Sequence, residues 1–251
     1  MDEAIAQHLN AINRAFYEAT ADEFDASRAE AWGGWRRLLP VLRPLMVAEL
    51  SALAELSALD VGCGNGRFGV FLAESLRCRL SYHGVDSSAA LLERARAALV
   101  GRPDVSARFS ALDLLDSACF DGTYRLVALI AVLHHIPGRA RRAELLRTLA
   151  DRVAPDGLLV FTTWRFHEFP RFQRRLLPWD ADLAGRVEPG DYLLDWRRGR
   201  HADLPALRYC HALDDDEEAE LIAASGLRPI MVFRADGEGD RANSYVVLRR
   251  T

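Results

Sequence analysis

The chain has 251 residues, a formal net charge of −4 and a hydrophobic content of 50%. This length and composition suit one large domain with a full core, and the weak negative charge gives no general argument for binding nucleic acid. The sequence contains no lysine, which excludes a P-loop, a pyridoxal Schiff base and the lysine-bearing strand of a protein kinase.

Further absences narrow the class of protein. The longest apolar run, residues 126–133, is far shorter than the roughly 20 residues of a membrane-spanning helix. The acidic N-terminus lacks the pattern of a signal peptide. The four cysteines form no C-x-x-C pair, so neither a zinc site nor a disulfide framework is indicated. We therefore expect a cytoplasmic protein without a membrane segment or a bound metal.

A helical N-terminal segment is followed by alternating strands and helices. Residues 1–50 have apolar positions at mixed three- and four-residue spacing, which favours helices. The next elements are a strand in 56–62 that ends in a glycine turn, a helix at 67–76, a strand in 82–88, a helix at 88–99, a strand with its exit at 105–114, a strand at 124–133, a helix at 139–153, a turn at 155–157 and a strand at 158–164. This alternation indicates βαβ units and a parallel sheet.

The C-terminal part predicts an antiparallel end to the sheet. Residues 214–226 are typical of a helix closed by Gly226. Residues 228–234 and 244–250 predict two strands, and the loop 235–243 between them is short enough for a hairpin. We interpret the acidic run at 214–218 as a complement to the helix dipole rather than as a metal site.

Residues 165–212 interrupt the alternation and interleave arginines with aromatic residues. A segment of this length inside a compact sheet is usually functional, and it follows a strand near the edge where α/β sheets bind ligands. Its arginines and aromatic rings suit contacts with phosphates and stacking on unpaired bases. Acidic residues are interspersed with them, so a solvated surface of mixed charge is an equal alternative.

The turn at residues 60–66 has the pattern D-x-G-x-G-x-G between a strand and a helix. Its glycines let a ligand approach bare backbone, and the helix N-terminus attracts negative charge. A dinucleotide fingerprint would need a third glycine where Arg67 stands. Asp86 ends the next strand, where a carboxylate can accept both hydroxyls of a ribose, and Asp113 with Leu114 follows the third strand.

These features together resemble the class I S-adenosylmethionine-dependent methyltransferases. The resemblance implies an α/β, Rossmann-like fold with a mostly parallel seven-stranded sheet, an antiparallel C-terminal hairpin and helices on both faces. It also implies S-adenosylmethionine as cofactor. The cofactor-binding residues that it indicates are Asp60, Gly62, Gly64, Gly66, Asp86, Asp113, Leu114 and Ala131.

Residues 17–32, 130–136 and 208–213 are similar to the wobble-uridine tRNA methyltransferase family. Members esterify the carboxylate of 5-carboxymethyluridine in the anticodon loop, and the eukaryotic ones work with a small zinc-binding activator protein. The resemblance implies that Arg28 and one of His134 and His135 serve catalysis. This chain departs from the family at residues 195–197, at Cys210 and at Ser244, which leaves the acceptor open.

The acceptor decides which residues the chemistry needs. A carboxylate is already ionised near pH 7, so a guanidinium such as that of Arg28 has only to hold it. A hydroxyl or amine acceptor would need His134 or His135 as a general base. We expect Tyr17, Arg165 and Arg208 to bind the acceptor, which is a tRNA or a small molecule with a carboxylate or hydroxyl; a binding module without catalysis is a third hypothesis.

We expect one methyltransferase domain over residues 1–251 with four parts. Residues 1–50 form a helical lid, and residues 51–164 form the cofactor-binding core. Residues 165–212 form an insertion on the substrate side, and residues 213–251 supply the last helix and strands.

Overall fold

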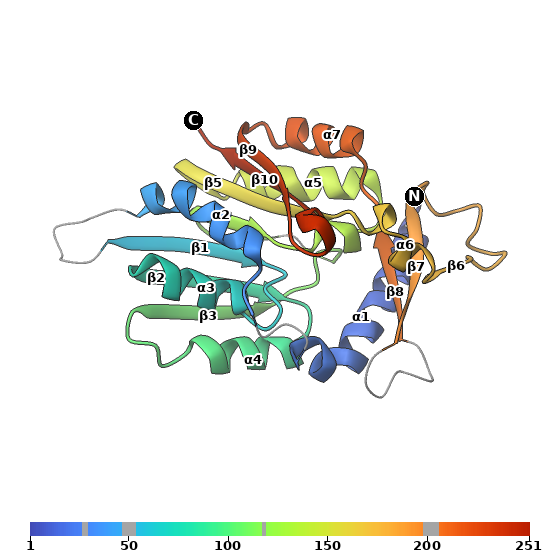
Figure 1. Cartoon of the computed structure of the whole chain (residues 1–251), viewed down its shortest axis with the longest axis horizontal. Helices are drawn as coiled ribbons and strands as arrows, with labels where there is room; N and C mark the ends of the chain where they lie inside the picture. Colours follow the sequence, from blue (N-terminus) through green and yellow to red (C-terminus); the bar gives the residue numbers. More distant parts are fainter. Residues whose placement is uncertain (27–29, 47–53, 117–118, 198–205) are drawn as a thin grey trace.

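A computed structural model describes residues 1–26, 30–46, 54–116, 119–197 and 206–251. Its main feature is a seven-stranded sheet of order β3-β2-β1-β4-β5-β10-β9 (Figure 1). The strands are β1 (Glu55–Val61), β2 (Arg79–Asp86), β3 (Val105–Ala111), β4 (Tyr124–Leu129), β5 (Val153–Trp164), β9 (Arg228–Ala235) and β10 (Asn243–Arg249). Strands β1 to β5 pair in parallel, whereas β10 lies antiparallel between β5 and β9. The predicted fold class is confirmed.

Helices cover both faces of this sheet because its central strands are apolar on both sides. One face carries α2 (Gly33–Leu42), α3 (Arg67–Leu76) and α4 (Ala89–Leu99), and the other carries α5 (Arg139–Ala150) and α7 (Asp215–Ser225). In β5, Leu158 and Val160 enter the first core and Leu159 and Phe161 the second, as the two-residue period of a strand requires. Among the helices of the described residues, none has both the length and the apolar character of a bilayer crossing.

Local sequence sets the ends of these helices. Ser88 caps α4 by accepting a hydrogen bond from the backbone N–H of Leu91, and Asp214 caps α7 in the same way through Glu217. Gly226 ends α7 with a φ of 67°, a left-handed conformation that glycine adopts at little cost. The predicted start of α4 and the predicted end of α7 are therefore confirmed.

Residues 165–212 contain a second sheet that the sequence did not predict. It is antiparallel, with the strands β6 (Leu176–Leu177), β7 (Asp191–Trp196) and β8 (Ala206–His211), and the short helices η3 (Phe166–Glu168) and α6 (Pro170–Gln173) precede it. The N-terminal helix α1 (Glu3–Ala26) packs along β8. Figure 1 shows α1 and β8 beyond the carboxyl ends of the parallel strands, so both cover the edge where a ligand is expected. The described residues also contain the single-turn helices η1 (Arg43–Leu45), η2 (Leu133–His135) and η5 (Glu238–Asp240).

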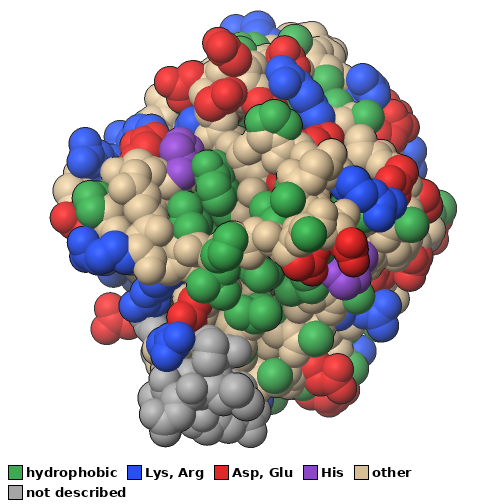
Figure 2. Space-filling model, turned by 90° about the vertical axis from the view of Figure 1, so that its right-hand side faces the viewer, with side chains coloured by type: hydrophobic (Ala, Val, Ile, Leu, Met, Phe, Trp, Pro, Cys, Tyr) green, Lys and Arg blue, Asp and Glu red, His purple; other side chains and the backbone are tan. Residues whose placement is uncertain are grey.

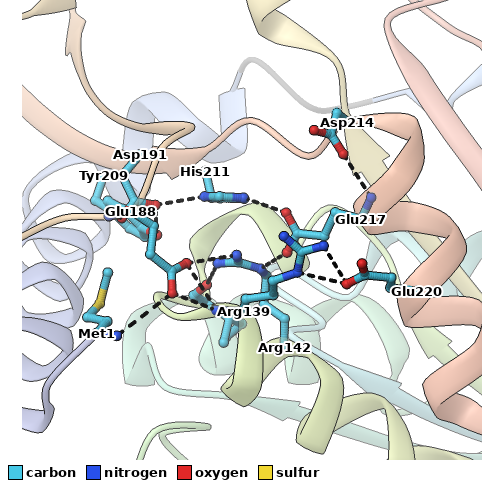
Figure 3. A network of polar contacts seen from close by, with 11 residues as sticks. Met1, Arg139, Arg142, Glu188, Asp191, Tyr209, His211, Asp214, Glu217 and Glu220 are labelled. Atoms are coloured by element: carbon cyan, nitrogen blue, oxygen red, sulfur yellow. Dashed lines mark hydrogen bonds and ion pairs between the residues drawn. The ribbon is translucent and has the colours of Figure 1, made fainter.

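A buried polar network fastens the small sheet to α5 and α7 (Figure 3). Arg142 donates to Glu217 at 2.7 Å and to Glu188 at 3.0 Å. The two ring nitrogens of His211 lie 2.7 Å from Asp191 and 2.8 Å from Glu217. Glu217, within the acidic run, is thus a buried ion-pair partner as well as part of the first turn of α7.

Candidate active site

A cavity of about 480 Å³ opens at the carboxyl ends of β1, β2 and β4. Its walls come from α1, from the glycine turn after β1, from the segments after β2, β3 and β4, and from the insertion. The predicted site residues that line it are Tyr17, Asp60, Gly62, Gly64, Asp86, Asp113, Leu114, Ala131, His134, His135 and Arg208. Cofactor-side and acceptor-side candidates therefore share one cavity.

The outer face over the insertion and α1 is mixed in character. Figure 2 shows hydrophobic side chains gathered in the middle of this face, with both arginines and acids around them. This mixture of charges fits both an RNA-binding surface and a solvated one. The cavity residues therefore carry the information about the acceptor.

The glycine turn brings bare backbone to the cavity. Gly62, Gly64 and Gly66 have φ values of 70°, 54° and 77°, which glycine tolerates far better than other residues. A Cβ on Gly62 would lie 2.3 Å from a methyl carbon of Val132. Gly62 and Gly64 line the cavity, but Gly66 does not; it packs against Ala95 of α4. Gly66 thus shapes the turn without facing the ligand space.

Two acids, Asp60 and Asp86, lie next to this turn. Asp86 accepts the backbone N–H groups of Gly64 at 2.8 Å and Ser88 at 2.9 Å, and burial raises its pKa in spite of these bonds. Asp60 is 2% exposed and accepts the hydroxyl of Tyr82 at 2.5 Å. Burial raises the pKa of Asp60 to about 7, because a carboxylate loses its hydration there.

The side of the cavity formed by the glycine turn, Asp86 and Asp113 is called the cofactor wall here, and its far end, at Asp113, lies next to α1. Asn10 donates to the Asp113 carboxylate at 2.8 Å, and Arg14 lies 3.7 Å from it. On the opposite side, Ala131 has a φ of 60°, and its backbone N–H donates to Thr162 at 2.8 Å. A left-handed conformation at a non-glycine residue is strained and concentrates at functional sites.

These features fit S-adenosylmethionine. Gly62 and Gly64 line the cavity without a side chain, so a ligand can approach their backbone. Asp86 still has lone pairs for two ribose hydroxyls after accepting two backbone bonds. The buried acid Asp60 matches a ligand that carries positive charge.

The acceptor side is a closed ring of aromatic and cationic contacts. The ring runs from Tyr17 to His135 (5.6 Å between ring centroids), His134 (4.2 Å), Trp164 (5.5 Å), the guanidinium of Arg208 (4.9 Å), Phe16 (5.2 Å) and back to Tyr17 (5.1 Å). The rings of the adjacent residues His134 and His135 thus lie next to each other. All members except Phe16 line the cavity.

Arg208 is the buried cation of this ring. It is 7% exposed, and its Nε has no hydrogen-bond partner. In the described part of the chain no carboxylate forms an ion pair with it, and its guanidinium lies over the rings of Trp164 and Phe16. A buried guanidinium without a counter-ion costs free energy, which an anionic ligand in the cavity would offset.

The other predicted residues lie elsewhere. Arg165 is 1% exposed and does not line the cavity; it pairs with Glu218 at 3.0 Å and Asp215 at 2.9 Å of α7. The structure gives Arg165 the role of a link between β5 and α7 instead of a contact with the acceptor. Arg28 lies outside the described residues. Sequence reasoning missed Arg67, Asn13 and Trp164, and only Arg67 carried a signal, as an odd residue in the glycine pattern.

A family model described as a methyltransferase domain matches residues 59–159, which include the glycine turn. The matched domain, together with the fold and the cavity, makes the protein an S-adenosylmethionine-dependent methyltransferase, and it resembles the class I enzymes. It is 29% identical over 213 residues to the "putative methyltransferase" of Encephalitozoon cuniculi, a match that covers 85% of each chain. It is 27% identical over 191 residues to the "probable tRNA methyltransferase 9B" of Bos taurus, covering 74% of this chain.

The chain spans only 37% of the length of that bovine relative. A solved methyltransferase from Clostridium acetobutylicum superimposes with a TM-score of 0.65 at 13% identity, covering 93% of this chain and 98% of that one. At this identity the likeness concerns the fold alone.

Proposed function

We propose that the protein methylates a carboxylate of its acceptor, and that this carboxylate belongs to a modified wobble uridine of tRNA. The observation that carries the proposal is Arg208, a buried guanidinium without an ion pair among the described residues, beside the cavity. Arginine binds a carboxylate through two parallel hydrogen bonds. A neutral hydroxyl or amine would leave this charge uncompensated.

Some residues of the cavity bind the cofactor, and others bind the acceptor. Asp86 holds the ribose hydroxyls, Asp113 and Leu114 bind the adenine, and Gly62 and Gly64 let the methionine arm approach the backbone. S-adenosylmethionine supplies a methyl group on a positively charged sulfur. Arg208 holds the acceptor so that one carboxylate oxygen faces this methyl group in line.

The step balances without a proton. A lone pair of the carboxylate oxygen forms the new carbon–oxygen bond, the methyl–sulfur bond breaks, and its electron pair stays on sulfur. The products are a neutral methyl ester and S-adenosylhomocysteine. Because the carboxylate is already ionised near pH 7, Tyr17, His134 and His135 have only to orient it and exclude water.

Two observations support tRNA as the acceptor. The similarity to tRNA methyltransferase 9B extends over 74% of this chain, and Arg171 and Arg175 of the insertion are exposed and line the cavity, where they can meet phosphates. That this protein works with a small zinc-binding activator protein is a prediction that rests on the family resemblance alone.

A second candidate is a small molecule that is methylated on a hydroxyl. It is favoured by the hydrogen bond between Tyr17 and His135, which measures 2.9 Å. A hydroxyl acceptor must lose a proton, and Tyr17 with His135 would form the path that removes it.

The two acceptors are separated by one transfer experiment. The protein is incubated with S-adenosylmethionine carrying a labelled methyl group, with total tRNA in one reaction and a small-metabolite extract in another. The proposal expects label in tRNA that mild alkali releases, since a methyl ester is saponified. Alkali-stable label in tRNA, or label in metabolites alone, contradicts it.

A further inference from the structure

Arg67 directly follows the glycine turn and has no assigned role. It is the first residue of α3 and lines the cavity. Its guanidinium lies 4.5 Å from the ring centroid of Trp32 and 4.8 Å from that of Trp35, and one nitrogen donates to the carbonyl of Glu30 at 3.0 Å. These contacts hold the guanidinium in place, and further N–H donors remain for a ligand.

The acids near Arg67 are bound to other groups. Asp236 accepts hydrogen bonds from the hydroxyl of Tyr245, from the amide of Asn243 and from the backbone N–H of Gly34. Asp60 accepts the hydroxyl of Tyr82. Across the described ranges Arg67 forms no ion pair, and burial lowers its pKa to about 10. It remains a cation at neutral pH, and no carboxylate among the described residues pairs with it.

The other arginines of the cavity lie in other places. Arg14 is next to Asp113 at the far end of the cofactor wall. Arg171, Arg175 and Arg208 belong to the insertion. Arg67 is therefore the arginine on the wall that holds the glycine turn, where the methionine arm of the cofactor must lie if Asp86 holds the ribose.

We propose that Arg67, which packs over the neighbouring rings of Trp32 and Trp35, binds the α-carboxylate of S-adenosylmethionine. The methionine arm carries one carboxylate, and a planar guanidinium held against two indole rings suits its two oxygens. Because Trp32 and Trp35 lie at the start of α2, this contact also ties α2 to the cofactor. The inference concerns the cofactor and does not depend on the identity of the acceptor.

The test compares S-adenosylmethionine with its decarboxylated analogue, which keeps the sulfonium, the amine and the nucleoside. Affinities are measured by titration calorimetry on the full chain. Arg67→Gln should weaken S-adenosylmethionine about ten- to a hundredfold and change the affinity of the decarboxylated analogue by less than about twofold. Arg67→Lys should fall between wild type and Arg67→Gln for S-adenosylmethionine, because lysine keeps the charge but not the planar fork.

Asp86→Asn is the matched control, because both ligands carry the same ribose and should weaken by the same factor. An equal loss for both ligands in Arg67→Gln would overturn the proposal, since it would show that Arg67 only shapes the turn. Unchanged affinity for S-adenosylmethionine would overturn it too. No acceptor is present in these titrations, so their result stands apart from the proposed methylation of a carboxylate.

Discussion

The hydroxyl of Tyr17 lies 2.9 Å from Nε2 of His135, so α1 and the segment after β4 meet through one hydrogen bond inside the cavity. Nδ1 of the same ring lies 3.1 Å from the backbone carbonyl of Tyr209 in β8. A proton on Nδ1 satisfies that carbonyl and leaves Nε2 to accept from Tyr17. One imidazole thus joins three distant parts of the chain.

The first prediction concerns this hydrogen bond. Tyr17→Phe removes the hydroxyl and keeps the ring that packs on Phe16. With a carboxylate acceptor we expect kcat to fall by no more than about tenfold at every pH, because one neutral hydrogen bond contributes about 1 kcal/mol. Loss of a proton-transfer path would instead lower kcat by about 10²–10⁴-fold. The measurement is kcat against pH for wild type, Tyr17→Phe and His135→Ala; a large loss that is restored at high pH would favour a hydroxyl acceptor.

The second prediction concerns Arg208. Arg208→Gln should lower kcat/KM for the acceptor about ten- to a hundredfold, since a hydrogen bond to a charged group contributes about 1.5–3 kcal/mol, and it should leave the Kd of the cofactor unchanged. Arg208→Lys should recover part of the loss. Arg228→Gln, at an exposed position in β9 outside the cavity lining, is the control. The measurement is steady-state kinetics with tRNA. Equal values of kcat/KM for Arg208→Gln and Arg228→Gln would contradict a role of Arg208 in binding the acceptor.

The cofactor side could be predicted from sequence because its determinants are local. The turn from Asp60 to Gly66 needs positive φ values at fixed spacing, and Asp86 follows from the next strand end. Arg67 was visible in the same motif, but its role depends on Trp32 and Trp35, which reach it only through the packing of α2. Local pattern therefore predicted glycines and acids that line the cavity, and it missed Arg67, which lines the same cavity.

The acceptor side could be predicted only in part, because the sequence does not show whether an arginine will face a carboxylate or a cavity in the folded protein. Arg165 and Arg208 both lie in the insertion, and both are buried. Arg165 meets two acids of α7, whereas Arg208 meets aromatic rings beside a cavity. That difference arises from a helix about fifty residues further along the chain, and the small sheet that carries Arg208 was itself not predicted.

The third prediction concerns Asp60 and pH. Burial raises the pKa of Asp60 to about 7, so the carboxylate of the free protein takes up a proton as the pH falls below about 7. A positively charged cofactor favours the ionised form. We therefore expect the affinity for S-adenosylmethionine to be level above pH 7 and to weaken below it, by at most about tenfold per pH unit. Calorimetry from pH 5.5 to 8.5 checks this; Asp60→Asn should remove the dependence, and a flat wild-type profile would contradict it.

The last prediction concerns the network that holds the small sheet. Burial alone would lower the pKa of His211, but its hydrogen bonds to Asp191 and Glu217 outweigh burial and raise it. For a histidine whose pKa is raised in the folded state, the stabilisation is complete below the unfolded value of 6.5 and is lost as pH rises through the folded value.

His211→Gln should therefore cost about 3–5 kcal/mol of unfolding free energy at pH 6 and clearly less at pH 9. Chemical denaturation at both pH values measures the difference, with His8→Gln, at an exposed position of α1, as the control. If His211→Gln destabilised the protein equally at pH 6 and pH 9, His211 would be a neutral hydrogen-bonding group and not a cation of the network.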